Sequence, residues 1–169
     1  MANENYIMLN GQKIEITVSE ERLRELGLIP EKKSPFERVE KNNRYWHINE
    51  AGHPAWFCDH YTTYEDDLFD AANYCTDKDI IMQRAMHEKL NRLLWRFSME
   101  NDGDKIDWKD FKKSKWFIFL NKLSDELRVS DYTYTNLYGV IFFSTKAIAQ
   151  KALDEIVKPF IKEHPKFRW

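Results

Sequence analysis

The sequence predicts an α+β fold in which an N-terminal ββα cap precedes two tandem β-β-β-α repeats, with antiparallel sheets packed on helices. One observation behind this is an Asn-Gly pair between two short alternating apolar runs near the N-terminus. The other is a pattern of strand, turn, strand, tyrosine-rich segment and amphipathic helix that occurs twice. We therefore expect a cap at residues 1–30, a connector at 31–43, a first repeat at 44–104 and a second repeat at 105–169.

The cap begins with a predicted hairpin over residues 6–18. Asn10 and Gly11 lie at its centre, and this pair is typical of a two-residue turn because both positions need positive φ. Ser19 is a predicted N-cap of a short helix, since its side chain can accept from the free amides of the first turn. Gly27 is a natural residue to end that helix. Thirty residues are too few for a stable core alone.

The internal repeat is the most informative feature of the chain. Residues 44–56 and 114–127 each read as two strands around a polar turn, and the tryptophans Trp46 and Trp116 are 70 residues apart. A third strand is then predicted in each copy, at 72–75 and 140–143. The helices that follow are predicted to begin at the N-caps Thr76 and Ser144, which are 68 residues apart.

Both predicted helices carry an apolar stripe at helical spacing, as expected for a buried face. We expect Pro159 to end or kink the second helix near Val157. The stripe of the first helix consists of Met82, Ala85, Met86, Leu90, Leu93, Leu94 and Phe97, and that of the second consists of Ala149, Ala152, Leu153, Ile156, Val157 and Phe160.

Composition excludes several classes of function. The chain has 169 residues, a formal net charge of −2 and only 5 glycines, whereas about 12 would be usual at this length. No Gly-rich phosphate-binding motif occurs. The longest apolar run, 116–120, is far shorter than the ~20 residues of a membrane span. The start does not read as a signal peptide, and we expect a cytoplasmic protein.

The cysteines and histidines suggest a metal or thiol site only weakly. Cys58, His60 and Cys75 could supply zinc ligands, but their spacing matches no structural zinc pattern. A nucleophilic cysteine paired with His60 or His87 is a second alternative, although nothing nearby would activate a thiolate. We expect two reduced, inert thiols. No catalytic residue, cofactor or metal is therefore predicted.

Two acidic stretches are predicted to be loops. Glu65, Asp66 and Asp67 with Asp70 are interpreted as a solvated loop rather than as an acid/base or cation site. Residues 101–110 resemble a calcium loop at first sight. However, a lysine stands where the loop needs its final bidentate glutamate. We expect a turn between the repeats at 101–104.

The sequence resembles a family of small phage and prophage proteins of Gram-positive bacteria. The resemblance is carried by Glu37-Arg38-Val39, by Tyr45-Trp46-His47-Ile48 with Gly52, by Ala72-Asn73-Tyr74-Cys75-Thr76 and by Val140-Ile141-Phe142-Phe143-Ser144. These are structural positions rather than catalytic ones. The resemblance implies a mobile-element origin, and with it a role in host interaction or counter-defence.

We therefore expect a non-enzymatic phage accessory protein that binds a host or phage protein, in host takeover or inhibition of a host defence system. Tyr and Trp dominate interface hot spots, and the predicted contacts are Trp56, Tyr61, Tyr64, Tyr132 and Tyr134. The alternative is nucleic-acid binding by the Lys-rich segment 105–122 and the basic, aromatic tail 158–169. No membrane partner is expected, and the sequence does not indicate an oligomeric state.

Overall fold

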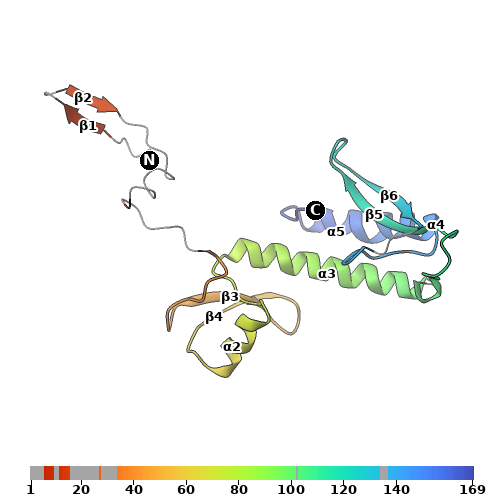
Figure 1. The fold of residues 1–169 in the computed structure, drawn as a ribbon, viewed down its shortest axis with the longest axis horizontal. Helices are drawn as coiled ribbons and strands as arrows, with labels where there is room; N and C mark the ends of the chain where they lie inside the picture. The colour runs from red at the N-terminus through yellow and green to blue at the C-terminus, as the bar shows by residue number, and fades with distance from the viewer. Residues whose placement is uncertain (1–5, 10–11, 16–26, 28–33, 102, 134–136) are drawn as a thin grey trace. The chain divides into compact units, whose positions relative to one another are not determined.

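The computed structural model describes residues 6–9, 12–15, 27, 34–101, 103–133 and 137–169. It is an α+β protein with three separate two-stranded antiparallel sheets in these residues (Figure 1). Contacts divide the chain between Glu37 and Arg38 into two units, which we describe one at a time. The last residues of the predicted connector, from Arg38 on, thus belong to the larger unit.

The N-terminal unit contains a hairpin of β1 (Tyr6–Leu9) and β2 (Gln12–Glu15). Leu9 pairs with Gln12, so two residues connect the strands, as the Asn-Gly signal predicts. The cap helix predicted from Ser19 lies outside the described residues.

The larger unit begins with a second hairpin, formed by β3 (Arg44–Ile48) and β4 (Pro54–Cys58). The third strand predicted at 72–75 is wrong, because only a single bridge joins Cys75 to β3. Ala72 has a left-handed φ of 53°, and the Asn73 side chain, rather than its backbone, bonds both backbone groups of Ile48. Backbone pairing between this segment and β3 is therefore limited to Cys75.

The acidic stretch predicted as a loop is the helix α2 (Thr63–Asp70). The Glu65 carboxylate accepts hydrogen bonds from the amide and the hydroxyl of Thr62, which precedes the helix. Glu65 and Asp66 lie in the first turn, where negative charge complements the helix dipole. The acidic residues are thus a helix-start signal.

The long helix α3 (Lys78–Glu100) follows, as predicted. Its N-cap is Asp77 rather than Thr76, because the Asp77 carboxylate accepts from the amides of Asp79 and Ile80. The second cap prediction is early by one residue as well, since Thr145 rather than Ser144 accepts from the Ile148 amide. A short 3-10 helix, η1 (Gly103–Lys105), lies in the turn after α3.

A third hairpin pairs β5 (Lys115–Asn121) with β6 (Glu126–Tyr132). The strand predicted at 140–143 is wrong in the same way as its counterpart, since only Phe143 bridges to β5, at Trp116.

The chain then forms α4 (Lys146–Ala152), the π-helical segment η2 (Leu153–Val157) and α5 (Lys158–Glu163). Pro159 is predicted to end or kink this helix near Val157; it does not end it, because the helical run continues through Pro159 to Glu163. The wider π-helical turn ends two residues before the proline. Pro159 has no amide to donate to the Glu155 carbonyl in a regular α-helix, and that carbonyl lies inside the π-helical turn.

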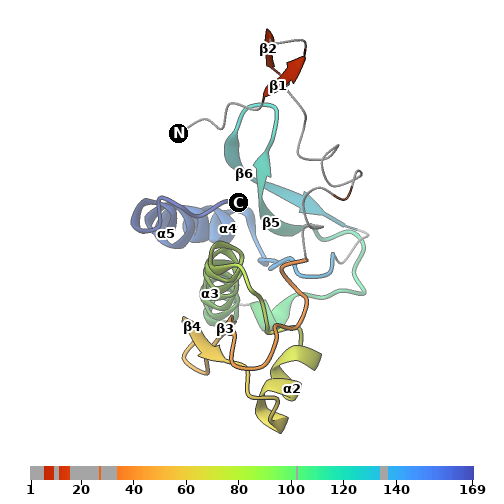
Figure 2. The same ribbon diagram turned by 90° about the vertical axis from the view of Figure 1, so that its left-hand side faces the viewer.

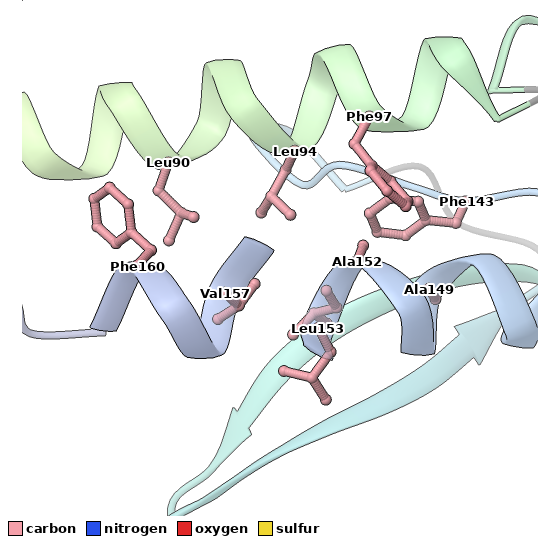
Figure 3. Packing of buried hydrophobic residues seen from close by; sticks show 10 residues of the cluster. Leu90, Leu94, Phe97, Phe143, Ala149, Ala152, Leu153, Val157 and Phe160 are labelled. Atoms are coloured by element: carbon pink, nitrogen blue, oxygen red, sulfur yellow. The ribbon is translucent and has the colours of Figure 1, made fainter. Parts of the chain in front are cut away.

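Two clusters of buried side chains hold the larger unit together, and both involve α3. The smaller one joins β3 to the first half of α3 through Ile48, Cys75, Ile81 and Ala85. The larger one joins the second half of α3 to α4, η2 and α5 (Figure 3). The β3–β4 hairpin and the C-terminal helices therefore lie on different sides of α3 (Figures 1 and 2). The larger cluster consists of Leu90, Leu94, Phe97, Ile118, Phe143, Ala149, Ala152, Leu153, Val157 and Phe160.

Candidate protein-binding surface

The first strand of the β3–β4 hairpin is packed on both faces. Strand residues alternate between faces, and Ile48 packs with Ile81 of α3 on one of them. On the other face, Tyr45 stacks on Tyr74 with ring centres 4.2 Å apart. Phe57 meets Tyr64 of α2 edge to face on that same side. β3 is thus packed between α3 on one face and Tyr74 on the other, whereas Trp56 and Phe57 of β4 stay half-exposed.

A buried carboxylate fixes the chain after β4. Asp59 is fully buried and accepts from Arg38 at 2.8 and 3.0 Å, from the Tyr74 hydroxyl at 2.9 Å and from the Tyr61 amide at 2.8 Å. Burial raises the pKa of Asp59, but these donors outweigh it and hold that pKa below its usual range. The network ties the loop that carries Tyr61 to the chain before β3.

Two buried polar side chains beside this network have no hydrogen-bond partner among the described residues. They are the hydroxyl of Tyr45 and both ring nitrogens of His47. Burial lowers the pKa of His47 and raises that of Tyr45 to about 12, so both side chains are neutral near pH 7. His47 stacks on Phe57, with ring centres 5.2 Å apart.

Four exposed aromatic side chains lie on β4 and on the segment that follows it. We call them the aromatic edge: Trp56, Phe57, Tyr61 and Tyr64. Their exposed fractions are 47%, 50%, 50% and 44%. Cations lie over two of the rings, with the Arg44 guanidinium 4.0 Å from the ring centre of Trp56 and that of Arg38 4.6 Å from Tyr61. Side chains that are large, aromatic and held in place are the usual anchors of protein interfaces.

The backbone of β4 is open on its outer side. Trp46 exchanges two backbone hydrogen bonds with Cys75, so its backbone groups point away from β4. Trp56 lies opposite Trp46. Because backbone groups alternate between the two sides of an antiparallel strand, the N–H and C=O of Trp56 point away from β3. No strand in the described part of the chain pairs with them.

The structure brings three of the five predicted contact residues together. Trp56, Tyr61 and Tyr64 lie on the aromatic edge, while Tyr132 is similarly exposed on β6 and stacks on Phe117. Tyr134 lies outside the described residues. The sequence analysis did not single out Phe57, because an aromatic residue inside a strand resembles a core residue until its strand is known to be an edge.

Several residues of the predicted basic segments interact with other residues of the protein. Lys115 is buried and donates to the Asp110 carbonyl, and Lys113 lies 3.5 Å from the Asp110 carboxylate. The tail is docked on α3, because the Gln83 amide donates to the carbonyl of Lys166 and its oxygen accepts from the amide of Arg168.

The candidate zinc residues do not form a cluster. Both Cys58 and Cys75 are free thiols, and burial raises the pKa of Cys75. His60 contacts Asn42. Among the residues that the structure describes, no group of three or more His, Cys, Asp or Glu side chains is placed to hold a metal ion. None of the described helices is both long and apolar enough to cross a membrane.

Beyond these features, comparisons of the chain with protein-family models, with curated proteins and with solved structures give no match.

Proposed function

We propose that the protein is a non-enzymatic binding protein that recognises another protein through the aromatic edge. The observation that carries this proposal is the exposure of four aromatic side chains on a rigidly mounted edge strand and the segment after it. Aromatic residues with adjacent arginines are the side chains that contribute most to protein interfaces. The sequence resemblance supports the rest of the proposal: the protein comes from a phage, and its partner is a host or phage protein. Binding would serve host takeover or inhibition of a host defence system.

The contacts that hold these residues in place support binding with a small loss of conformational entropy. Tyr61 follows the buried Asp59 network, and Tyr64 lies in the first turn of α2, which the capping interaction of Glu65 with Thr62 stabilises. Side chains already held in one place lose little freedom on binding, so more of the contact energy appears as affinity.

The form of the edge favours an extended segment of the partner. The free backbone groups of Trp56 allow an incoming strand to pair with β4. Trp56 and Phe57 point to opposite faces of the hairpin, so each face of the incoming strand would have one of these rings beside it. Pro54 at the start of β4 has no amide and limits pairing to the strand's later residues.

We also propose that residues 44–104 and 105–169 are copies of one unit, in which a β-hairpin and a segment with a single bridge to that hairpin precede a helix. In each half a tryptophan bridges to the residue two positions before the helix N-cap, and a lysine of the first helical turn lies over that tryptophan. The lysine nitrogen is 5.2 Å from the ring centre in the pair Lys78–Trp46 and 5.8 Å in the pair Lys146–Trp116. In the second copy Asp131 stands where Trp56 stands in the first. The aromatic edge is therefore specific to the first copy.

Photo-crosslinking tests the proposed function. Benzoylphenylalanine replaces Phe57 in the full chain, expressed in the cells in which the gene is normally found, and Leu123 is replaced in the control. Leu123 is almost fully exposed in the turn between β5 and β6. We expect a single protein adduct at position 57 that is absent at position 123 and lost when Trp56→Ala is added.

The same experiment can contradict the proposal. Equal adducts at positions 57 and 123 would show that the aromatic edge has no special affinity for protein. An adduct only to a second copy of the chain would assign the edge to self-assembly instead. Unchanged circular dichroism and thermal unfolding of each variant establish that a lost adduct is not a folding defect.

A further inference from the structure

The second half of α3 carries a basic and aromatic face that the β3–β4 hairpin meets only through its turn, at Arg92. The hairpin packs on the first half of the helix, at Ile81 and Ala85 (Figure 1). Farther along, Arg92, Trp95 and Arg96 follow one another at positions i, i+3 and i+4, which places them on one side of the helix. Trp95 is 58% exposed.

A cavity of about 440 Å³ lies where this face meets the turn between β3 and β4. That volume is within the range of about 300–1,000 Å³ that is usual for ligand sites. Its lining holds three cations and no carboxylate. The Lys89 ammonium also lies 5.9 Å from the ring centre of Phe160, and Glu88, outside the lining, pairs with Arg92. The local charge remains positive and favours an anion. The lining residues with polar or aromatic side chains are His53, Lys89, Arg92, Trp95 and Arg96.

The turn positions Arg92 in this cavity. A Cβ atom on Gly52 would lie 2.5 Å from an Arg92 guanidinium nitrogen, so the guanidinium occupies space that only glycine leaves free. Gly52 also has a φ of 81°, a conformation that other residues rarely adopt. The Glu88 carboxylate lies 3.6 Å from Nη1, the other terminal nitrogen of the guanidinium.

Arg96 is available to a ligand. No described carboxylate forms an ion pair with it, and its side chain lines the cavity beside Trp95. A cation with no ion-pair partner in the described part of the chain, next to an exposed indole ring, fits a ligand that carries a negative charge and a flat ring together. Nucleotides combine these two groups, with phosphates for the cations and a base for the indole.

We propose that this cavity binds a single-stranded nucleic acid, with one base stacked on Trp95 and the adjoining phosphates at Arg92, Arg96 and Lys89. An unpaired base is needed, because stacking on a side chain requires a base face that a duplex keeps covered. An acidic peptide would satisfy the cations but leave Trp95 without a ring to stack on. This site lies apart from the aromatic edge, and it does not involve the lysines of 105–122.

Fluorescence anisotropy with a labelled 12-nucleotide oligothymidylate tests the proposal at 50 mM salt. We expect Trp95→Ala to weaken binding by about 5- to 150-fold, the range that corresponds to loss of one stacked base. The matched control is Trp56→Ala, which removes an exposed tryptophan of the aromatic edge and should leave binding unchanged. Thermal unfolding of both variants shows that they are folded.

Charge dependence provides the second measurement. Three phosphates neutralised on a single strand give a slope of about −2 in log affinity against log salt, so affinity falls roughly tenfold between 50 and 150 mM. Arg96→Gln should reduce that slope by about 0.7. Lys122→Gln is the control, because Lys122 is an exposed lysine at the end of the predicted basic segment, and it should leave the slope unchanged.

Competition separates the possible ligands. Unlabelled oligothymidylate should displace the probe, whereas duplex of the same length and polyglutamate of equal charge should do so at least tenfold less well. Full displacement by a mononucleotide at equal phosphate concentration would overturn the assignment to a strand. Absence of binding at 50 mM salt, equal competition by polyglutamate, or wild-type affinity of Trp95→Ala would overturn the proposal, without bearing on crosslinking at Phe57.

Discussion

Replacing His47 by phenylalanine should stabilise the protein, although it removes a fully buried residue. Neither ring nitrogen of His47 has a partner among the described residues, and a buried polar group without a hydrogen bond costs about 1–3 kcal/mol. Phenylalanine keeps the stacking on Phe57 but is slightly larger, which costs ~1 kcal/mol in a packed site. We expect a net gain of roughly 1 kcal/mol at pH 7.5, or about 2–4 °C in Tm.

The gain should increase in acid. Burial lowers the pKa of His47 in the folded state, while the unfolded chain keeps an ordinary value of about 6.5. The unfolded state therefore takes up the proton first, and the free energy of unfolding falls as the pH drops below 6.5. The fall is at most about 1.4 kcal/mol per pH unit and ends at the folded-state pKa. His47→Phe removes this loss.

Urea denaturation followed by tryptophan fluorescence measures both effects. The difference in unfolding free energy between His47→Phe and the wild type should be positive at pH 7.5 and larger at pH 5. His53→Phe, at an exposed position in the turn after β3, is the control and should change neither value by more than ~0.5 kcal/mol. A variant less stable than wild type at pH 7.5, or a difference that shrinks in acid, would refute the reasoning.

Three further changes test the packing and the polar network. Asp59→Asn should cost about 2–4 kcal/mol because it breaks a buried ion pair with Arg38. The variant should also lose less stability than the wild type as the pH falls below ~4, because the wild-type carboxyl takes up its proton first in the unfolded state. Urea midpoints between pH 3 and 7 would show both effects. Thr62→Ala should cost ~1 kcal/mol by removing the cap of α2, seen as a lower urea midpoint. Leu94→Ala should cost about 2–5 kcal/mol from the larger cluster, seen as a lower Tm.

The spacing of apolar residues in the sequence predicted most of the helices. Most residues of the two predicted stripes are buried or partly buried, because burial of an apolar face decides where a helix packs. The sequence did not predict that the stripe of α4 to α5 packs against the second half of α3, while Ala85 of the α3 stripe belongs to the smaller cluster. The helix starts were less certain, since Thr76 and Asp77 are both good capping residues. Which of them caps depends on a backbone conformation that the local sequence does not determine.

The features that sequence reasoning missed depend on contacts between distant residues. Asp59 is buried because Arg38, 21 positions earlier, and Tyr74, 15 positions later, both donate to it. The cavity beside Trp95 requires Gly52 to lie under Arg92. Neither contact leaves a periodic pattern or a motif. The acidic residues in the first turn of α2 indicated its start, however, because Glu65 stands three positions after Thr62 in the spacing of a capping box.

The position of α3 between the two clusters has a consequence for synthesis of the chain. When α3 has left the ribosome, the β3–β4 hairpin can already pack on its first half, but Leu90, Leu94 and Phe97 have nothing to cover them. Their partners are Ile118 and the residues from Phe143 to Phe160, all of which are made after α3. A nascent chain thus carries an apolar stripe in water until its final quarter emerges, which is the period of greatest exposure to aggregation and to chaperones.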